Sequence, residues 1–160
     1  MPVATQRAVF VETAEAREVQ HIALLLGYGA TAINPYLAFE IVADLALHNG
    51  FKYSINVSKA LENYIKALCK GLMKIMSKMG ISTLRSYRGA QVFEAVGLNR
   101  DVIEKYFSGT ASRIEGLGLQ EIAAEANARY RLAHETDPDA KNILPSGGHY
   151  AYRKDGERHL

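Results

Sequence analysis

Short apolar runs alternate with helical stretches over the first fifty residues, and this alternation constrains the fold more than any other feature of the sequence. Residues 8–11 (AVFV) place β-branched and aromatic side chains together with no polar residue between them, which predicts a buried strand. Residues 30–33 (ATAI) form a second short strand candidate. A stretch with helical periodicity follows each run. The sequence therefore predicts parallel strands that are joined by right-handed crossover helices.

The first predicted helix carries its apolar side chains on one face: Val19, Ile22, Ala23 and Leu26. We expect Thr13 to cap its N-terminus, and Gly27 and Gly29 to end it. Asn-Pro at 34–35 is typical of a helix start, because Asn can accept a cap bond and Pro needs no N–H partner in the first turn. This second helix should end at Asn-Gly, residues 49–50.

The longest periodic segment runs from about Ser58 to Met79 and predicts a long amphipathic helix. Its apolar stripe consists of Leu61, Ile65, Leu68, Leu72, Ile75 and Met79. The lysines between Lys59 and Lys78 occupy other faces and predict a solvated surface, with a partner surface as the alternative. Gly71 lowers helix stability by about 1 kcal/mol relative to Ala, so we expect it to allow the close packing of a neighbour.

The elements beyond the long helix are shorter. We predict a weak third strand at 81–84, a helix at 89–96, a helix at 101–107 that Asn99 caps, and a helix from about 119 to 133. The last helix should turn one of two sets inward: Ile122, Ala126 and Tyr130, or Ala123 and Leu132. The predicted fold is α/β and helix-rich, with short parallel strands and crossover helices, as an incomplete piece of a larger barrel-like α/β domain.

The composition excludes several classes of protein. The 160-residue chain is long enough for a hydrophobic core, and its net charge of +2 gives no signal for nucleic-acid binding. No apolar run reaches the roughly 20 residues that span a bilayer, and residues 1–7 do not form a secretory signal. The single cysteine, Cys69, can form neither an internal disulfide nor an iron–sulfur ligand set. We expect a cytoplasmic protein, or a plastid protein in a photosynthetic eukaryote.

The densest polar group in the sequence follows the weak strand candidate. Its members are Ser82, Thr83, Ser86, Tyr87, Arg88 and Gln91. Ligands of α/β folds gather where a strand leads into a helix, and Arg88 can clamp a carboxylate or a phosphate. A small anion-binding or phosphate-binding module is one interpretation of the Ser82–Arg88 region. The alternative is a capped helix in which Arg88 pairs with Glu94 or with a neighbouring domain.

Other polar or glycine-rich groups favour structural roles. Gly-Tyr-Gly at 27–29 follows a helix, whereas a dinucleotide-binding loop precedes one, so a helix stop and a turn are favoured. The hydroxyl-rich group at 108–113 lacks the spacing of a phosphate loop and favours a capped turn. None of the five histidines has the i, i+4 partner expected of a zinc-binding helix. They are His21, His48, His134, His149 and His159.

The remaining reactive side chains do not form a site. Cys69 follows Leu68 on the long helix, and we expect it to be a small buried apolar group rather than a nucleophile. Glu12, Glu15 and Glu18 indicate a charged helix start, and would act as acid and base only if an apolar pocket shifted the pKa of one of them. The residues alone therefore predict no catalytic, cofactor-binding or metal-binding site.

Several long, glycine-punctuated stretches resemble the large subunit of glutamate synthase, and they occur in the same order. These are 11–18 (VETAEARE), 27–30 (GYGA), 32–38 (AINPYLA), 63–67 (NYIKA), 74–83 (KIMSKMGIST), 86–95 (SYRGAQVFEA) and 112–116 (SRIEG). The resemblance covers about residues 8–160 and is weaker in the tail. Ala14 stands where many members are expected to carry glycine, which affects only the local turn.

The resemblance implies an enzyme that reductively transfers the glutamine amide nitrogen to 2-oxoglutarate to give glutamate. Its large subunit would comprise an amidotransferase with a catalytic first cysteine, a central domain, an FMN-binding barrel with a three-iron four-sulfur cluster, and a β-helix. This sequence would correspond to the end of the central domain, 1–134, and to a linker or lead-in to the barrel, 135–160. No catalytic, cofactor-binding or metal-binding residue is carried over, so FMN and the cluster are expected only in the full-length family member.

The expected partners are the remaining domains of the same subunit and a small electron-transfer subunit or ferredoxin, without nucleic acid or membrane. The start at Met1 and the end at Leu160 are taken to indicate a truncated reading frame. Three hypotheses remain open. The chain is a structural fragment with exposed apolar surface, a small ligand-binding module that uses Ser82, Thr83, Arg88 and Gln91, or a standalone enzyme, which we do not expect.

Overall fold

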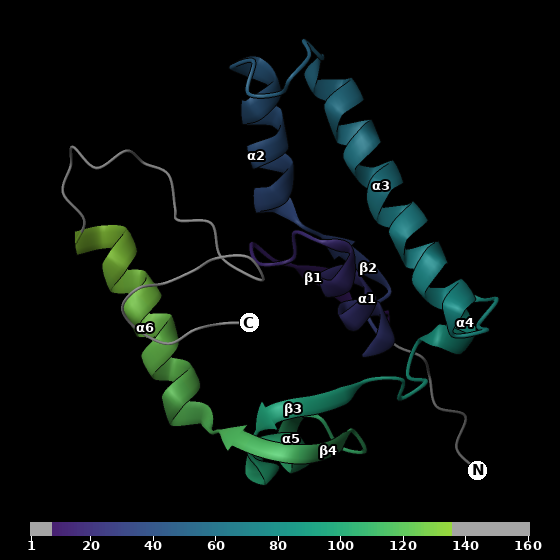
Figure 1. Cartoon of the computed structure of the whole chain (residues 1–160), viewed down its shortest axis with the longest axis vertical. Coiled ribbons are helices and arrows are strands. Elements are labelled where there is room, and N and C mark those ends of the chain that lie inside the picture. The colour runs from purple at the N-terminus through teal and green to yellow at the C-terminus, as the bar shows by residue number, and fades with distance from the viewer. Residues whose placement is uncertain (1–7, 136–160) are drawn as a thin grey trace. The chain divides into compact units, whose positions relative to one another are not determined.

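The computed structural model describes residues 8–135, which divide into two compact units. Residues 8–95 with 109–111 form the first unit, and residues 96–108 with 112–135 form the second. The elements are β1 (Phe10–Glu12), α1 (Val19–Gly27), β2 (Ala32–Asn34), α2 (Tyr36–Leu47), α3 (Val57–Lys78), α4 (Leu84–Tyr87), β3 (Glu94–Leu98), α5 (Arg100–Tyr106), β4 (Ala111–Leu117) and α6 (Leu119–Glu135) (Figure 1). The predicted linker at 135–160 lies outside the described residues, apart from its first residue.

β1 and β2 form a parallel pair with α1 as the crossover between them, as the sequence predicts. Val11 pairs with Ile33, and both side chains are half-buried on the face that meets the core. Phe10 lies on the opposite face, because side chains alternate along a strand, and it is 76% exposed. The prediction of a buried strand at 8–11 is therefore wrong, because only Val11 is half-buried and the described elements cover only one face of this small sheet.

The core of the first unit gathers around Tyr87, whose side chain is fully buried. The buried members of this core are Ala16, Ile22, Leu26, Met76 and Tyr87. The predicted inner face of α1 is confirmed, because Ile22, Ala23 and Leu26 are buried. The core therefore joins α1 to the C-terminal end of α3 and to α4.

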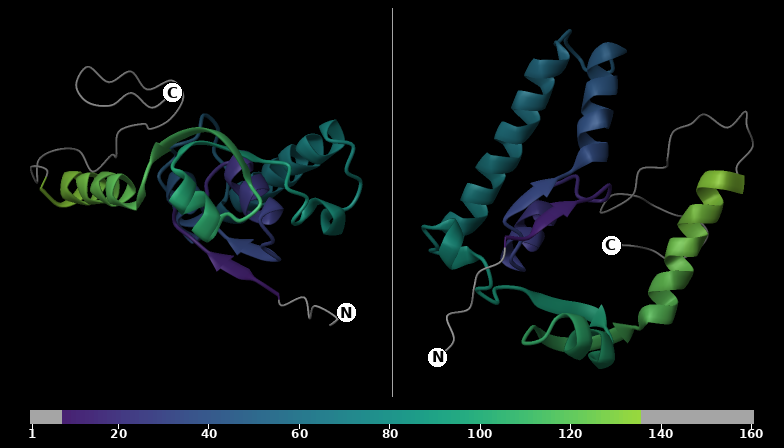
Figure 2. Two further views of the ribbon diagram at one scale, coloured as in Figure 1. Left: turned by 90° about the horizontal axis from the view of Figure 1, so that it is seen from below. Right: turned by 180° about the vertical axis from the view of Figure 1, so that it is seen from behind.

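The long lysine-rich segment is the helix α3, as predicted, and it packs against both α1 and α2. Figures 1 and 2 show α2 and α3 side by side and running in opposite directions. Asn56 Oδ1 accepts a hydrogen bond from Lys59 N at 2.7 Å and caps α3. A Cβ added at Gly71 would collide with the side chain of Val19. The glycine therefore allows the close approach of α1, as expected.

The start of α1 differs from the prediction. Thr13 Oγ1 accepts from Glu15 N at 3.1 Å and closes a turn before the helix, rather than capping it. Glu18 is the residue at the N-cap. The ring of His21 turns back along the helix, and its Nδ1 accepts from the backbone N–H groups of Arg17 and Glu18 at 3.1 and 3.3 Å. His21 therefore supplies the hydrogen-bond acceptor at the start of α1, a role that was predicted for Thr13.

The start of α2 also differs from the prediction. Asn34 ends β2, and its side-chain amide donates to Glu12 Oε1 at 3.1 Å across the sheet. Pro35 occupies the N-cap position, whereas it was predicted at the first helical position, which Tyr36 takes instead. Cross-strand pairing with the neighbouring strand therefore engages the side chain that was expected to cap the helix.

Residues 81–83 are not a strand, contrary to the prediction. Thr83 has extended backbone angles but caps the short helix α4, because its Oγ1 accepts from Ser86 N at 3.2 Å. The segment connects α3 to α4 without a strand partner among the described residues.

The helix predicted at 89–96 is also wrong, because its last residues belong to strand β3. Gly89 and Gln91 adopt positive φ angles of 72° and 53°, which are incompatible with continued helix. Pairing with β4 then holds the following residues extended, and such tertiary context outweighs local propensity.

In the second unit, β3 and β4 run in the same direction and α5 forms the crossover between them (Figure 1). Asn99 N donates to the carbonyl of Leu117 at 2.9 Å at the ends of the two strands. Asn99 Oδ1 accepts from Val102 N at 3.0 Å, so the predicted cap of α5 is confirmed. Val102 and Ile103 are the buried residues of α5. Most of β4 was not predicted, since a capped turn was expected at 108–113.

The helix α6 follows β4 with the predicted start, but none of its described side chains is buried. Ile122 is exposed, and Tyr130 is 62% exposed. Ala123 and Ala126 are exposed as well, so neither predicted inward set is buried among the described side chains. Tyr130 stacks on His134 of the next turn, with ring centroids 4.1 Å apart.

The described residues have a mixed α/β fold that is rich in helix and contains short parallel strands, as the sequence predicts. Their strands belong to two separate two-stranded sheets, and they form no closed barrel. Among the described helices, none combines the length and the apolar character that a bilayer-spanning helix requires.

Candidate functional site

The polar group predicted from the sequence begins at the start of α4, in the first unit. Thr83 Oγ1 lies 2.8 Å from Ser86 Oγ in addition to accepting from Ser86 N. Both hydroxyls are exposed, and together they close the first turn of α4. For Thr83 and Ser86 the structure therefore confirms the second interpretation, a capped helix, rather than an anion-binding group.

Tyr87 is the anchor of this region rather than a reactive group at its surface. Its hydroxyl donates to the carbonyl oxygen of Ala23 in α1 at 3.0 Å. The ring of Phe93 meets it edge to face, with centroids 6.4 Å apart. Burial raises the pKa of the Tyr87 hydroxyl above its usual value, because the phenolate is poorly solvated there. Tyr87 therefore fixes α4 on α1 and offers no accessible proton.

Arg88 is engaged at the beginning of β2. Its Nη1 donates to Thr31 Oγ1 at 3.1 Å, and the same oxygen accepts from Val9 N at 3.2 Å. This places the guanidinium at the amino ends of the parallel strands, whereas ligands of α/β sheets gather at the carboxyl ends. Thr31 thus takes the place of the acidic partner considered in the sequence analysis.

Gln91 packs against Gly109, a neighbour that neither Thr83 nor Arg88 contacts. A Cβ added at Gly109 would lie 2.6 Å from Gln91 Nε2, so the amide covers this glycine closely. Gly109 has a φ of 84° and belongs to the same unit. The candidate side chains Thr83, Arg88 and Gln91 therefore contact three different neighbours and do not converge on one point.

The carboxyl ends of β1 and β2 carry a second polar group, whose two members the sequence analysis did not bring together. Glu12 was predicted at a helix start, but it ends β1. Glu12 and Asn34 are register partners, and their side chains are joined by the 3.1 Å hydrogen bond described above. They border an open hollow that Phe10, Val11, Glu12, Ala32, Ile33 and Asn34 line. The signal available in the sequence was the presence of one polar residue directly after each apolar run. Because the two side chains bond to each other, the hollow presents no pair of reactive groups.

The glycine-rich turn at 27–29 is a helix stop, as predicted. Tyr28 N donates to the carbonyl of Leu24 at 2.9 Å, and Gly29 has a φ of 107°. Tyr28 also bonds to Thr110 through the two side-chain oxygens, 3.0 Å apart. In the group at 108–113, Ser112 Oγ is buried and lacks a hydrogen-bond partner among the described residues.

The described histidines serve helix ends. His48 Nδ1 lies 3.0 Å from both the carbonyl and the Oδ1 of Asp44. His134 Nδ1 lies 2.8 Å from the carbonyl of Tyr130, and His21 accepts at the start of α1. His149 and His159 lie outside the described residues. Within residues 8–135, no cluster of histidine, cysteine and carboxylate side chains could hold a metal ion.

Cys69 is exposed on α3, so the prediction of a buried cysteine is wrong. The inward stripe of α3 passes through Leu68 and Leu72, and Cys69 lies beside it on the solvent side. A lone exposed thiol with no adjacent base is not an activated nucleophile.

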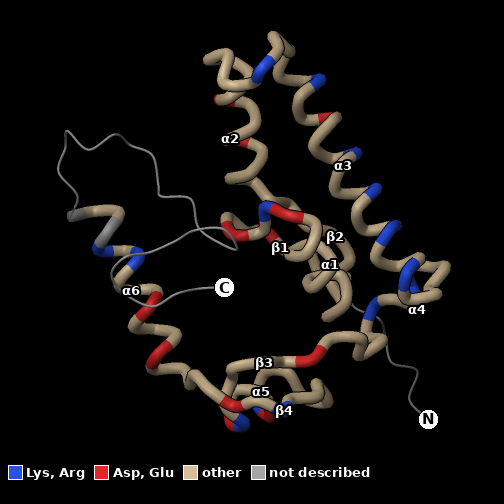
Figure 3. Tube along the Cα trace, in the orientation of Figure 1, with Lys and Arg blue, Asp and Glu red and all other residues tan. Residues whose placement is uncertain are grey.

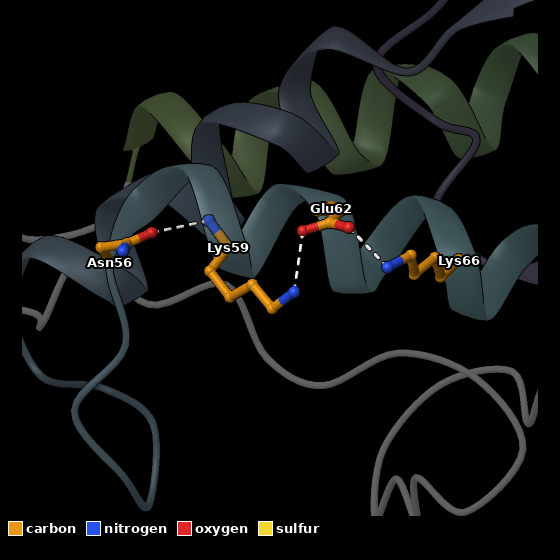
Figure 4. Close-up of polar contacts among 4 residues, drawn as sticks. All are labelled: Asn56, Lys59, Glu62 and Lys66. Carbon is orange, nitrogen blue, oxygen red and sulfur yellow. Dashed lines mark hydrogen bonds and ion pairs between the residues drawn. The ribbon is translucent and has the colours of Figure 1, made fainter.

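A charged group on the outer side of α3 is held by ion pairs (Figure 4). Glu62 accepts from Lys59 Nζ at 2.9 Å and from Lys66 Nζ at 2.5 Å. The hydrogen bonds from Lys66 and Lys59 hold the pKa of the Glu62 carboxyl below its usual value. All three side chains are about half exposed, so these pairs contribute little to stability. This part of the lysine series is the solvated face that was predicted.

Comparison with known proteins identifies the family. The family model described as the glutamate synthase central domain matches residues 2–99 of the 160. The chain belongs to the glutamate synthase central domain family. The resemblance stated from the sequence is thereby confirmed. The matched residues include β1, α1, β2, α2, α3, α4 and β3, which is most of the first unit.

Relatives that carry the glutamate synthase name cover almost the whole chain. The NADPH glutamate synthase large chain of Bacillus subtilis is 49% identical over 155 residues, which are 97% of this chain and 10% of that protein. The NADH glutamate synthase of Schizosaccharomyces pombe is 46% identical over 96% of this chain and 7% of its own length. A ferredoxin-dependent glutamate synthase of Antithamnion sp. is 40% identical over 96% of this chain. The chain spans about a tenth or less of the length of these curated relatives.

Proposed function

We propose that this chain is a non-catalytic scaffold segment of a glutamate synthase. The reaction of that enzyme would be the reductive transfer of the glutamine amide nitrogen to 2-oxoglutarate, within ammonia assimilation and glutamate biosynthesis. One observation carries the proposal: the polar side chains that could have formed a site each bind a different structural neighbour. Thr83 caps a helix, Tyr87 anchors α4 to α1, and Arg88 binds Thr31.

The scaffold role rests on packing surfaces. The described residues bury a core around Tyr87, yet they leave large apolar side chains such as Phe10 and Tyr53 exposed. Where such side chains gather into patches, they mark surfaces that other protein parts cover. In a glutamate synthase, such covering would hold the glutamine site and the 2-oxoglutarate site at a fixed separation, so that ammonia passes between them without loss to water.

The cofactors implied by the resemblance do not fit the residues of this segment. A three-iron four-sulfur cluster needs several cysteine thiolates, and this sequence has only Cys69. An FMN phosphate is usually held at the start of a helix by free backbone donors, and within the candidate polar group the start of α4 is already capped by Thr83. We therefore assign FMN and the cluster to other parts of the full-length enzyme.

We propose the remaining domains of the same subunit as the partners of this segment. The electron donor would be a nicotinamide, through a small partner subunit, or ferredoxin, since both kinds of name occur among the relatives. We place the protein in the cytoplasm, or in a plastid if the source is a photosynthetic eukaryote.

The isolated chain offers a direct test. With glutamine, 2-oxoglutarate, FMN and a reduced electron donor, the purified folded chain should form no glutamate, and calorimetry should detect no binding of FMN. Flavin bound in a 1:1 ratio, together with glutamate formation by this chain alone, would overturn the proposal.

A second candidate is a small anion-binding module at Ser82–Arg88. The planar guanidinium of Arg88 favours this candidate, because the Nη1 bond to Thr31 uses only one of its N–H donors. Calorimetric titration with phosphate and with 2-oxoglutarate decides this candidate. Saturable heat that disappears in Arg88→Gln would support it, and the absence of heat in a folded sample would remove it.

A further inference from the structure

The helix α2 is unusually apolar for a helix with an exposed side. Glu40 and Asp44 are its only charged residues. Its outward side also carries large apolar side chains, and these are Tyr36, Ile41, Leu45 and Leu47. Leu47 alone is 68% exposed. Helices that are apolar on nearly all sides are normally buried, so the outward side of α2 needs a covering surface.

The outward side of α3 offers the opposite charge. Lys66, Lys70 and Lys74 recur every four residues along it. Lys66 pairs with Glu62, whereas Lys70 and Lys74 have no acidic partner among the described residues. Met73 lies beside these lysines and is 61% exposed. Ile65 was predicted on the inward apolar stripe, but this prediction is wrong, because Ile65 is 46% exposed. The outward side of α3 therefore combines unpaired positive charge with apolar surface.

The charges of the first unit are separated along the chain, as the blue and red segments of Figure 3 show. Residues 57–88 contain five lysines, two arginines and one glutamate, a formal charge of +6. Residues 8–47 contain one arginine, four glutamates and one aspartate, a formal charge of −4. Two copies of the chain could therefore attract each other through unlike helices.

The spacing of the charges on the two helices matches. Glu40 and Asp44 are four residues apart, as are Lys70 and Lys74, and four residues rise about 6 Å along a helix. Opposite charges that flank an apolar seam are how paired helices select their partner and their register. A twofold arrangement would form this contact twice, with α2 of each copy on α3 of the other.

We propose that the outward sides of α2 and α3 form an interface between two copies of this chain, with Glu40 and Asp44 of one copy facing Lys70 and Lys74 of the other. A nucleic acid fits this surface less well. The carboxylates on α2 repel phosphate, and the lysines of α3 alternate with aliphatic side chains, whereas sites for nucleic-acid strands combine positive charge with stacking aromatic rings.

Two charge-reversed variants test the proposal. We expect light scattering to detect a dimer of the unmodified chain, with dissociation that increases as salt is added. Glu40→Lys with Asp44→Lys, and separately Lys70→Glu with Lys74→Glu, should each weaken the dimer by about 100-fold, because each places like charges in contact. An equimolar mixture of the two variants should restore a heterodimer, because both of its contacts then pair opposite charges, one in the native sense and one reversed.

Matched controls use the exposed residues Glu104 and Lys105 of α5. Glu104→Lys and Lys105→Glu should leave the dimer unchanged, and circular dichroism should show that all variants keep the helix content of the parent. A monomer at every accessible concentration would overturn the proposal. A dimer that survives both reversals, or variants that fail to form the heterodimer, would overturn it as well.

Discussion

The two units share one motif and differ in how it is buried. Each contains two parallel strands joined by a crossover helix, β1–α1–β2 in the first unit and β3–α5–β4 in the second. In the first unit α3 packs on α1, and their side chains enclose Tyr87. Among the described residues of the second unit, only Val102 and Ile103 of α5 are buried hydrophobic residues, and no described side chain of α6 is buried. Local β-α-β geometry therefore does not by itself produce a core, because the long-range packing of further helices is required.

The largest expected effect comes from removing the centre of the first core. Tyr87→Ala should lower the free energy of unfolding by about 3–5 kcal/mol, because a buried aromatic side chain leaves a cavity that cannot collapse fully. Ile103→Ala in the second unit should cost about 2 kcal/mol, at the lower end of such substitutions, since fewer buried neighbours surround it. Urea denaturation gives the change in the free energy of unfolding for each variant, and hydrogen exchange shows which unit is destabilised. Equal costs would contradict the comparison.

The next effect tests the approach of α1 to α3. Gly71→Ala should destabilise the first unit by about 1–3 kcal/mol, because the new Cβ meets the side chain of Val19. The double variant Gly71→Ala, Val19→Ala should recover part of this loss. If Gly71→Ala stabilises the chain, as expected for a solvent-facing helix position, the close packing of α1 on α3 is wrong.

A smaller effect concerns the hydroxyl of Tyr87. Tyr87→Phe should cost about 1 kcal/mol at neutral pH, because the carbonyl of Ala23 loses its donor. The folded state raises the pKa of this hydroxyl above the ordinary value of 10.0. The stability that it contributes is therefore complete below pH 10 and declines as the pH rises through the folded-state pKa. Melting curves between pH 8 and about 11 should fall less steeply for Tyr87→Phe than for the parent, and parallel curves would contradict this assignment.

The smallest effect should be the same in both units. Asn56→Ala removes the cap of α3, and Asn99→Ala removes the cap of α5. Each should cost about 1 kcal/mol, because a cap bond is local and does not depend on the surrounding core. A cost at Asn99 several times that at Asn56 would show that the second unit depends on its cap more than its small buried core suggests. Asn→Asp at either position retains an acceptor and serves as the control.

Features that depend on neighbouring residues were predictable from the sequence. The long stripe of α3 predicted its bounds to within one residue, and Asn99 predicted the start of α5. Features that depend on distant residues were not predictable. Glu94–Leu98 is extended because β4 pairs with it, and Asn34 leaves its cap position because Glu12 lies across the sheet.

The candidate site shows the same division. The hydroxyls of Thr83 and Ser86 were correctly associated with a helix start, because that contact spans three residues. The partner of Arg88 could not be inferred, because Thr31 lies 57 positions away in the chain. The burial of Tyr87 depends on α1 and α3 together. A polar cluster in the sequence therefore became a structural junction once the chain folded.

The central claim, that this segment supplies packing surfaces but no reactive group, is tested most directly in a chimaera. The corresponding segment of the Bacillus subtilis large chain would be replaced by this chain, and glutamate formation would then be measured for Thr83→Val, Arg88→Gln and Gln91→Ala in that background. We predict kcat values within about threefold of the parent chimaera, because the proposed scaffold role gives none of these groups a contact with the reacting atoms. A fall in kcat of about 100-fold in any variant whose stability and flavin content are unchanged would contradict the claim.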